Sequence, residues 1–420
     1  MTLTVRDAML DGHRVNVRAG DDGRIAAIGA DVQPVPGDDV FEAAGKALVP
    51  GLVNGHTHAA MTLFRGYGDD LPLMEWLEQH IWPAEARLTA DDVYWGTRLA
   101  CLEMIRSGTV NFWDMYWQPG AVAQAVEDAG MRATVGGPLI DALDPANTPK
   151  LREDAVRGVE AIDGHGHRVQ PGLAPHSIYA VSEPSLRWIA EYAAAHDLPV
   201  HIHLSETEDE VERCVDAHGE RPGPYLDRLG LLGPRTLLAH GVWLDDDELA
   251  LVAERGATVV TNPVSNMKLA VGRVFPYHAA RARGVPIGLG TDGAGSNNSL
   301  DLFQDVKVFA LLQKHEARDP AAITAPDAWA IATGRSAPLL GQSGAIAVGE
   351  PADFLLLRDD SPELAFGYQE ADLVYAASAE AVDTTVVDGR VLMRGRRVEG
   401  EEEVRVRAVE QARRLGVAPR

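Results

Sequence analysis

The stretch Pro50-Gly51-Leu52-Val53-Asn54-Gly55-His56-Thr57-His58 decides how the rest of the chain is interpreted. The apolar run from Ala47 to Val53 predicts a short buried strand, and two histidines follow at i and i+2, so that both side chains leave the same face. Imidazole is the commonest protein ligand for zinc and similar divalent ions. The spacing therefore indicates half of a four-ligand metal site, but the same pair could be structural unless further ligand-type residues follow other strands.

After Pro50 the chain alternates between short apolar runs and longer helical patterns, which is typical of an α/β protein with a parallel sheet. Eight predicted strands indicate a (β/α)8 TIM barrel, whose active site would lie at the carboxyl ends of the strands. Helices are expected over Ala90–Ser107, Pro184–His196 and Leu300–His315. The predicted strands end near His56, Asp114, Gly137, His176, His203, His240, Asn262 and Asp292.

Both ends of the chain consist of short alternating strands separated by turn residues such as Asp388-Gly389. We expect residues 1–49 and 345–420 to pair into one small β-sandwich beside a metal-dependent barrel of residues 50–344. A charged helix is expected over Glu401–Leu415. The expected strands are Leu3–Val5, Arg14–Val17 and Ile25–Ile28 at one end and Ala345–Val348, Ala352–Leu357, Thr384–Val387 and Arg390–Met393 at the other.

Composition excludes some classes of partner. The 62 acidic and 38 basic residues give a net charge of −24, which argues against nucleic acid because polyanions are bound by neutralising their phosphates. No apolar run approaches the length of a membrane span and no signal-like segment follows Met1, so we expect a cytoplasmic protein without a membrane partner. Cys101 and Cys214 are expected to be packed thiols. We expect a small-molecule substrate and assembly into a homo-oligomer.

Further ligand-type side chains follow other predicted strands. The run from Pro199 to Glu206 contains a second His-x-His, in which His203 suits a third metal ligand. His201 lies one layer deeper on the same face, where a structural role is favoured. His240 and Asp292 also close apolar runs, and the glycines around Asp292 permit close approach of the backbone to a bound group. Three histidines and one aspartate, with a position left for water, are what a hydrolytic zinc site needs.

Six segments carry a resemblance to a known family: Pro50–His58, Leu173–Tyr179, Val200–Glu206, Leu238–Leu244, Asn262–Leu269 and Leu289–Asn298. In combination they resemble the motifs of the amidohydrolase superfamily, most closely its aminohydrolase branch. This branch includes the S-adenosylhomocysteine and methylthioadenosine deaminases and the triazine hydrolases. The resemblance implies one divalent metal ion, zinc in the first place, with iron and manganese as alternatives. The implied ligands are His56, His58, His203 and Asp292.

The resemblance also implies catalytic roles: Glu206 shuttles a proton to a ring nitrogen, His240 and Asp292 activate the water, and His176 contacts the substrate. Elementary chemistry agrees with it. Deamination of an aromatic ring needs hydroxide attack on the carbon that bears the amine, protonation of the adjacent ring nitrogen and protonation of the departing ammonia. A glutamate after a strand is usually solvated, but Glu206 stands three residues from His203 and is our candidate for both protonations.

A long insertion, residues 71–85, follows the first predicted strand of the barrel. The resemblance to nucleoside deaminases places Trp76 against the substrate and Glu85 on the ribose hydroxyls; alternatively, Trp76 and its apolar neighbours simply pack a lid. The arginine that family members acting on S-adenosylhomocysteine tend to carry near the end of the third strand is absent from Thr134–Pro138. Substrates that bear an amino-acid group are therefore disfavoured.

The sequence predicts a metal-dependent hydrolytic deaminase that releases ammonia from an adenine-type ring. The expected substrate is an adenosine-like nucleoside: a 5′-modified adenosine, methylthioadenosine or a compound of the S-adenosylhomocysteine class. The alternative is hydrolysis of another substituted N-heterocycle, such as a triazine, a pterin, an oxidised purine or aminofutalosine. A non-catalytic scaffold is disfavoured, because every candidate ligand and acid–base residue is present.

Overall fold

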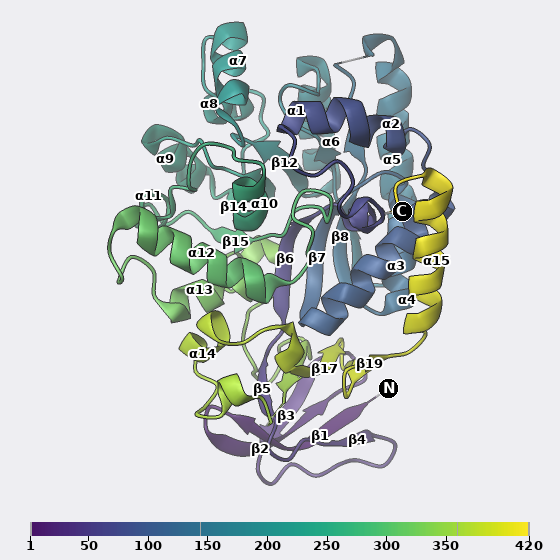
Figure 1. Ribbon diagram of the computed structural model, residues 1–420, viewed down its shortest axis with the longest axis vertical. Coiled ribbons are helices and arrows are strands. Elements are labelled where there is room, and N and C mark those ends of the chain that lie inside the picture. Colours follow the sequence, from purple (N-terminus) through teal and green to yellow (C-terminus); the bar gives the residue numbers. More distant parts are fainter. Residues whose placement is uncertain (1, 143, 359, 419–420) are drawn as a thin grey trace.

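The computed structural model describes residues 2–142, 144–358 and 360–418 (Figure 1). Within these ranges, two parallel four-stranded sheets and one two-stranded pair form the middle of the chain, and one nine-stranded sheet joins its two ends. The first parallel sheet contains β6 (Leu52–Thr57), β7 (Thr109–Met115), β8 (Arg132–Gly136) and β10 (Val169–Pro171). The second contains β12 (Val200–Leu204), β13 (Thr236–His240), β14 (Thr258–Thr261) and β15 (Ile287–Leu289), and the pair is β9 (Pro138–Leu139) with β11 (Ala174–Pro175).

Backbone contacts connect the two parallel sheets at both edges. Isolated parallel bridges join Leu173 to Val200 and Ser177 to His203, next to β12. At the other edge, the amide of Asp292 donates a hydrogen bond to the carbonyl of His56 at 3.0 Å. The predicted α/β architecture is confirmed, and the strands end where the sequence predicts, so their carboxyl ends gather on one side.

Helices follow the strands and cover the parallel sheets (Figure 1). Helix α3 shows why they form where they do: Thr89 and Asp92 make a reciprocal capping box at its start, and Gly108 ends it with φ 86°. A side chain at Gly108 would clash with Leu355 of the terminal sheet. The α-helices of the middle region are α3 (Ala90–Ser107), α4 (Pro119–Ala129), α5 (Thr148–Asp163), α6 (Glu183–His196), α7 (Glu208–His218), α8 (Pro222–Arg228), α9 (Asp246–Arg255), α10 (Pro263–Lys268), α11 (Tyr277–Ala282), α12 (Leu302–Ala317) and α13 (Ala325–Ala332).

The insertion after β6 folds into one helical run across the carboxyl ends of the strands (Figure 1). Its middle turn is π-helical, with the amide of Trp82 bonded to the carbonyl of Leu77, and the next residue, Pro83, has no amide hydrogen to continue a regular ladder. The run, called the lid below, consists of α1 (Leu73–Trp76), η2 (Leu77–Ile81) and α2 (Trp82–Glu85).

The two ends of the chain share the nine-stranded sheet, in the order β19-β18-β17-β16-β5-β1-β2-β3, with β4 paired to β1. This pairing gives a single sheet, so the two-layered sandwich and the domain boundaries at residues 49 and 344 stay predictions. Its strands are β1 (Leu3–Leu10), β2 (His13–Ala19), β3 (Ile25–Gly29), β4 (Asp39–Glu42), β5 (Ala47–Pro50), β16 (Phe354–Leu357), β17 (Val382–Val387), β18 (Arg390–Arg394) and β19 (Arg397–Val398). The remaining elements are α14 (Glu370–Tyr375), α15 (Glu401–Leu415), η1 (Ala59–Phe64), η3 (Pro145–Asn147), η4 (Pro338–Leu340), η5 (Pro362–Leu364) and η6 (Ala379–Ala381).

One expected strand is wrong. Residues Ala345–Val348 form no strand, and Val348 is largely exposed. Glycines with positive φ stand on both sides, Gly344 at 59° and Gly349 at 91°, and they turn the backbone away from an extended path. An alternating apolar pattern gives a strand only where a neighbouring strand can pair with it.

Four charged residues, two of them buried and two partly buried, join the terminal sheet to the amino-terminal ends of β8 and β10; we call them the basal ion cluster. Arg132 donates to Asp353 and to Asp388, both at 2.7 Å, and Arg168 lies 3.6 Å from Asp388. The amide of Asp388 also donates to Asp353 at 2.6 Å. Each buried carboxylate therefore has a cationic partner from the opposite part of the molecule.

None of the helices in the described part of the chain has the length and apolarity that a bilayer span requires. Cys101 and Cys214 are both buried and unpaired, as packed thiols should be.

Candidate active site

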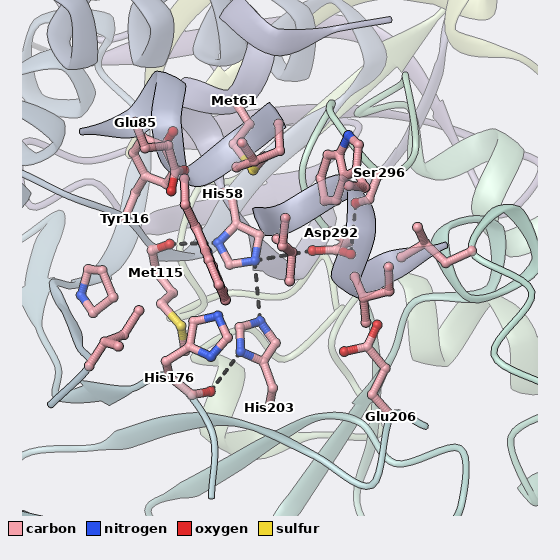
Figure 2. A pocket seen from close by; sticks show the side chains of 18 of the residues that line it. His58, Met61, Glu85, Met115, Tyr116, His176, His203, Glu206, Asp292 and Ser296 are labelled. Atoms are coloured by element: carbon pink, nitrogen blue, oxygen red, sulfur yellow. Dashed lines mark hydrogen bonds and ion pairs between the residues drawn. The ribbon is translucent and has the colours of Figure 1, made fainter. Parts of the chain in front are cut away.

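Four histidines converge where β6, β12 and β13 end, and each is held through its Nδ1 atom. Nδ1 of His58 lies 2.6 Å from the carbonyl of Met115, and Nδ1 of His203 lies 2.7 Å from the carbonyl of His176 (Figure 2). Nδ1 of His240 lies 2.8 Å from the amide oxygen of Asn266. Because these oxygens can only accept, each of the three rings carries its hydrogen on Nδ1 and leaves Nε2 as a lone pair.

His56 is held in the same way by another histidine. Its Nδ1 lies 2.7 Å from Nε2 of His201, and both rings are buried. When Nδ1 of His56 donates this hydrogen bond, Nε2 of His56 keeps its lone pair, which faces the rings of His58, His203 and His240. The prediction of a structural role for His201 is confirmed: it orients a candidate ligand from one layer deeper in the sheet.

Asp292 faces the histidines from the loop after β15, three residues beyond the end of the strand. Its Oδ1 lies 3.3 Å from Nε2 of His56 and 3.2 Å from Nε2 of His58. Its Oδ2 accepts hydrogen bonds from Ser265 at 2.7 Å and from Ser296 at 2.8 Å, and the two bonds fix the carboxylate plane. Figure 2 shows the contact with Ser296.

The arrangement fits one divalent metal ion. Nε2 of His56 is buried without a hydrogen-bond partner, and Nε2 of His203 lies 3.2 Å from Nε2 of His58. Two ligands bound to one zinc ion at about 2.0–2.1 Å with tetrahedral angles would lie about 3.3 Å apart. The donor atoms within 4.8 Å of one another fall into two overlapping groups, His56 with His58 and His203, and His56 with His240 and Asp292. The chemistry of these donors accepts zinc, iron or manganese.

Glu206 stands beside these histidines at the end of β12. Its Oε2 lies 3.8 Å from Nε2 of His240, and the residue is 7% exposed. Burial raises the pKa of Glu206, and nearby His240 partly opposes that rise. The backbone is strained at these strand ends, since Ser205, His240 and Asp292 have φ of 52°, 73° and 63°. Non-glycine residues adopt such angles at a cost, and they concentrate at functional sites.

His176 completes the inner wall of the site. Its ring centroid lies 4.6 Å from that of His203, and Figure 2 shows the two rings side by side. Burial lowers the pKa of His176 to about 3. The imidazole is therefore neutral near pH 7, able to donate one hydrogen bond and accept another.

A pocket opens above this cluster, and the lid forms part of its wall. Glu85 lines it, accepts a hydrogen bond from the Trp117 indole at 3.1 Å, and has its pKa raised by burial. Trp76 also lines it, with its indole N–H bonded to the carbonyl of Tyr67, so the ring presents its carbon atoms to the pocket. Both interpretations of Trp76 are compatible with this position. The apolar part of the wall is formed by Leu73, Leu77, Ile81, Trp82, Met115, Pro138, Ile140 and Leu269.

Every candidate residue from the sequence lies in or against this pocket, and their chemical roles stay predictions. The residues that sequence reasoning missed lie one contact further out: Ser265, Asn266 and Ser296 hold Asp292 or His240. Ser265 and Asn266 belong to the segment Asn262–Leu269, which carried the resemblance without an assigned role. Ser296 belongs to another such segment, Leu289–Asn298, and its contact with Asp292 depends on the fold of the loop after β15.

Comparison with known proteins agrees with this architecture. The model of the Amidohydrolase family matches residues 47–392. The 5′-deoxyadenosine deaminase of Methanoregula boonei is 49% identical over 383 residues, covering 90% of this chain and 86% of the relative. The 5-methylthioadenosine/S-adenosylhomocysteine deaminase 1 of Archaeoglobus fulgidus is 42% identical over 402 residues, covering 93% of each. The crystal structure of an adenosine deaminase from Xanthomonas campestris with bound zinc superposes with a TM-score of 0.90 at 32% identity, covering 99% of this chain and 98% of that one.

The chain belongs to the amidohydrolase family. The resemblance carried by the six sequence segments is thereby confirmed.

Proposed function

We propose that this protein is a metal-dependent hydrolytic deaminase that releases ammonia from the adenine ring of an adenosine-like nucleoside with a small, uncharged 5′ substituent. One observation carries the proposal: histidine Nε2 atoms, the carboxylate of Asp292 and the carboxyl of Glu206 meet at the floor of one pocket. The names of the relatives, 5′-deoxyadenosine deaminase and methylthioadenosine/S-adenosylhomocysteine deaminase, support the same class of reaction.

His56, His58, His203 and Asp292 would hold the metal ion, for which we propose zinc. Such an ion supplies Lewis acidity that lowers the pKa of water towards about 7. His240 and Asp292 take up the proton that the water loses. Glu206 delivers its proton to the ring nitrogen beside the reacting carbon, takes a second proton from the hydroxyl group newly bonded to that carbon, and passes it to the departing amine. The proton held by His240 and Asp292 then restores Glu206, whose raised pKa suits a group that carries a proton near neutral pH.

The pocket wall supports the substrate assignment. Glu85 would accept hydrogen bonds from the ribose hydroxyls, Trp76 would pack against the nucleoside, and His176 would contact the ring. Among the described residues that line this pocket there is no lysine or arginine. A 5′ substituent that carries a carboxylate would find no cation there, whereas a hydrogen or a methylthio group would rest on the apolar wall.

We also propose that the parallel strands close into a (β/α)8 barrel formed by residues 50–344, with residues 1–49 and 345–420 as its companion domain. The contacts of β12 with the segment 173–177, and of Asp292 with His56, join the two parallel sheets at both edges and support closure. Barrel enzymes place their active sites at the carboxyl ends of the strands, where the histidine cluster lies.

The proposal is tested by measuring ammonia release from a substrate panel. We expect 5′-deoxyadenosine, methylthioadenosine and adenosine to be deaminated with kcat/KM well above that of S-adenosylhomocysteine. If the enzyme releases only chloride or alkylamine from triazines, the proposal is wrong.

Substitution of Glu85 distinguishes the proposed function from the alternative, which is hydrolysis of a substituted heterocycle without ribose. A Glu85→Gln enzyme should lose nucleosides selectively, with free adenine, pterins and triazines little affected, if Glu85 binds ribose. Glu85 lines the pocket but lies on the lid rather than beside the histidines, so metal content serves as the control and should not change. Equal losses for ribosides and free bases would favour the alternative.

A further inference from the structure

The loop that carries Glu206 is held by a second buried carboxylate. Glu210, in the first turn of α7, accepts hydrogen bonds from two successive backbone amides: Oε1 from Ser205 at 2.9 Å and Oε2 from Glu206 at 2.8 Å. The residue is 3% exposed, and within the described residues no lysine or arginine forms an ion pair with it. Its partners are thus the two amide groups themselves.

This contact fixes the backbone from which the Glu206 side chain leaves. Ser205 has φ 52°, so the chain turns sharply at the end of β12. The amide hydrogens of Ser205 and Glu206 therefore point to the same side, toward the Glu210 carboxylate. Successive amides in such a turn form a concavity that binds an anion. A carboxylate whose two oxygens each accept one of these hydrogens determines both the position and the direction of the next residue.

We infer that Glu210 is a positioning residue for the proton transfers of Glu206. This inference rests on the proposed function, in which Glu206 protonates the ring nitrogen and the departing amine. Glu210 does not line the pocket above the histidines, so it acts through Glu206 and not on the substrate. Proton transfer needs donor and acceptor within hydrogen-bond reach, and a displacement of about 1 Å can reduce a rate by about 100-fold.

Glu210→Gln is the sharpest variant, because its side chain keeps the size of glutamate. One oxygen can still accept from one amide, but the NH2 group would face the second amide hydrogen and must move away from it. We expect kcat for a deaminated nucleoside to fall about 10- to 100-fold, with KM within about threefold and metal content unchanged. Glu210→Asp keeps the charge but is shorter, and serves in place of Glu210→Gln should that variant not fold.

A comparison of two leaving groups distinguishes a loss of Glu206 positioning from a general loss of activity. In deamination, the C6–O bond forms, the C6–N bond breaks, and ammonia leaves only after receiving a proton. In hydrolysis of a 6-chloropurine riboside, chloride leaves with the electron pair of the C6–Cl bond and needs no proton. We therefore expect Glu210→Gln to reduce deamination at least about fivefold more than dechlorination.

Glu248 provides the matched control. It is 1% exposed and accepts hydrogen bonds from the amides of Gly223 at 2.8 Å and Asp245 at 3.1 Å, but it lies on α9, outside the pocket. Unlike Glu210, it also pairs with an arginine, Arg221, at 2.8 Å. Glu248→Gln should lower thermal stability and leave kcat within twofold of the wild type. Three results would each overturn the inference: an unchanged kcat in Glu210→Gln, equal losses for both leaving groups, or an equal kcat loss in Glu248→Gln.

A wild-type enzyme that releases no ammonia from any nucleoside would instead overturn the proposed function, and the inference with it. An active wild type with an unaffected Glu210→Gln variant would overturn the inference alone.

Discussion

Buried charged groups lie at both ends of the parallel strands, and the two groups are built in opposite ways. In the basal ion cluster, Arg132 reaches Asp353 and Asp388 at 2.7 Å each, so the charges are neutralised within the chain. At the carboxyl ends, histidine lone pairs and the Oδ1 of Asp292 point at one another across 3.2–3.3 Å. The first arrangement is complete, whereas the second fits a cation from outside the chain.

The difference separates residues that hold the fold from residues that do chemistry. A buried ion pair loses several kcal/mol when one partner is removed, since the other charge is then left without compensation. A cluster of electron-pair donors around one point contributes little to folding by itself, because its members compete for the same space. Substitutions at the two ends should therefore change different observables.

The largest effect is expected for Asp292→Asn. The variant removes a proposed ligand and a proton acceptor at once, so kcat for ammonia release should fall at least about 1000-fold. Metal content, measured by elemental analysis, should fall with it, while the free energy of unfolding of the metal-free protein should stay close to that of the wild type. A variant that keeps a tenth of the activity would show that Asp292 lies outside the chemistry.

Arg132→Met should give the reverse result. It leaves Asp353 and Asp388 buried without their main cation, and because Arg132 is partly accessible we expect a loss of about 2–4 kcal/mol in the free energy of unfolding. The folded fraction should retain kcat within twofold. Arg157→Met is the control, because this arginine pairs with Glu153 and Asp154 on the exposed face of α5 and should contribute less than about 1 kcal/mol. If Arg132→Met and Arg157→Met lost the same free energy of unfolding, the basal ion cluster would have no special role in stabilising the fold.

Removal of the metal by a chelator sharpens the comparison. Activity should vanish and return on addition of zinc, and at a free metal concentration of about 100 times Kd the bound ion should raise the free energy of unfolding by about 2.7 kcal/mol. Because the two clusters share no partner, the metal should stabilise Arg132→Met by the same amount as the wild type. A smaller gain in the variant would mean that the two ends are coupled.

The sequence was informative wherever a feature depended on local pattern. Helices α3 and α15 begin and end at the predicted residues, and the ligand candidates were found because each follows an apolar strand. The fold of the middle region could therefore be anticipated, together with the residues that face the pocket. Residues Ala345–Val348 were assigned wrongly because strand formation depends on a pairing partner that local alternation does not reveal.

Contacts between distant segments could not be predicted. Arg132 and Asp353 are 221 positions apart, and nothing near either residue indicates the other. The same holds for Asn266 and for Glu210, whose roles depend on loops that bring their side chains to His240 and to the amides beside Glu206. The residues that line the pocket were thus easier to find than the residues that hold them in place.

The smallest effect is expected at an ion pair that belongs to neither cluster. In the terminal sheet, Arg18 donates to both oxygens of Asp38, at 2.9 and 3.1 Å, and this holds the pKa of Asp38 well below its ordinary value of 3.8. A lowered pKa means that the unfolded chain binds the proton more readily, so the stabilisation is present above about pH 4 and is lost as the pH falls below it.

Asp38→Asn should therefore cost about 1 kcal/mol at pH 6 and progressively less towards pH 3, measured by denaturant unfolding at both values. Asp39→Asn is the control, because Asp39 pairs with Arg394 on the exposed face and should change stability little at either pH. A cost for Asp38→Asn that does not depend on pH would mean that the packing of this side chain, and not its charge, stabilises the sheet. Catalysis should be unaffected in either case, since β2, which carries Arg18, and β4, which begins directly after Asp38, lie at the end of the molecule opposite the lid (Figure 1).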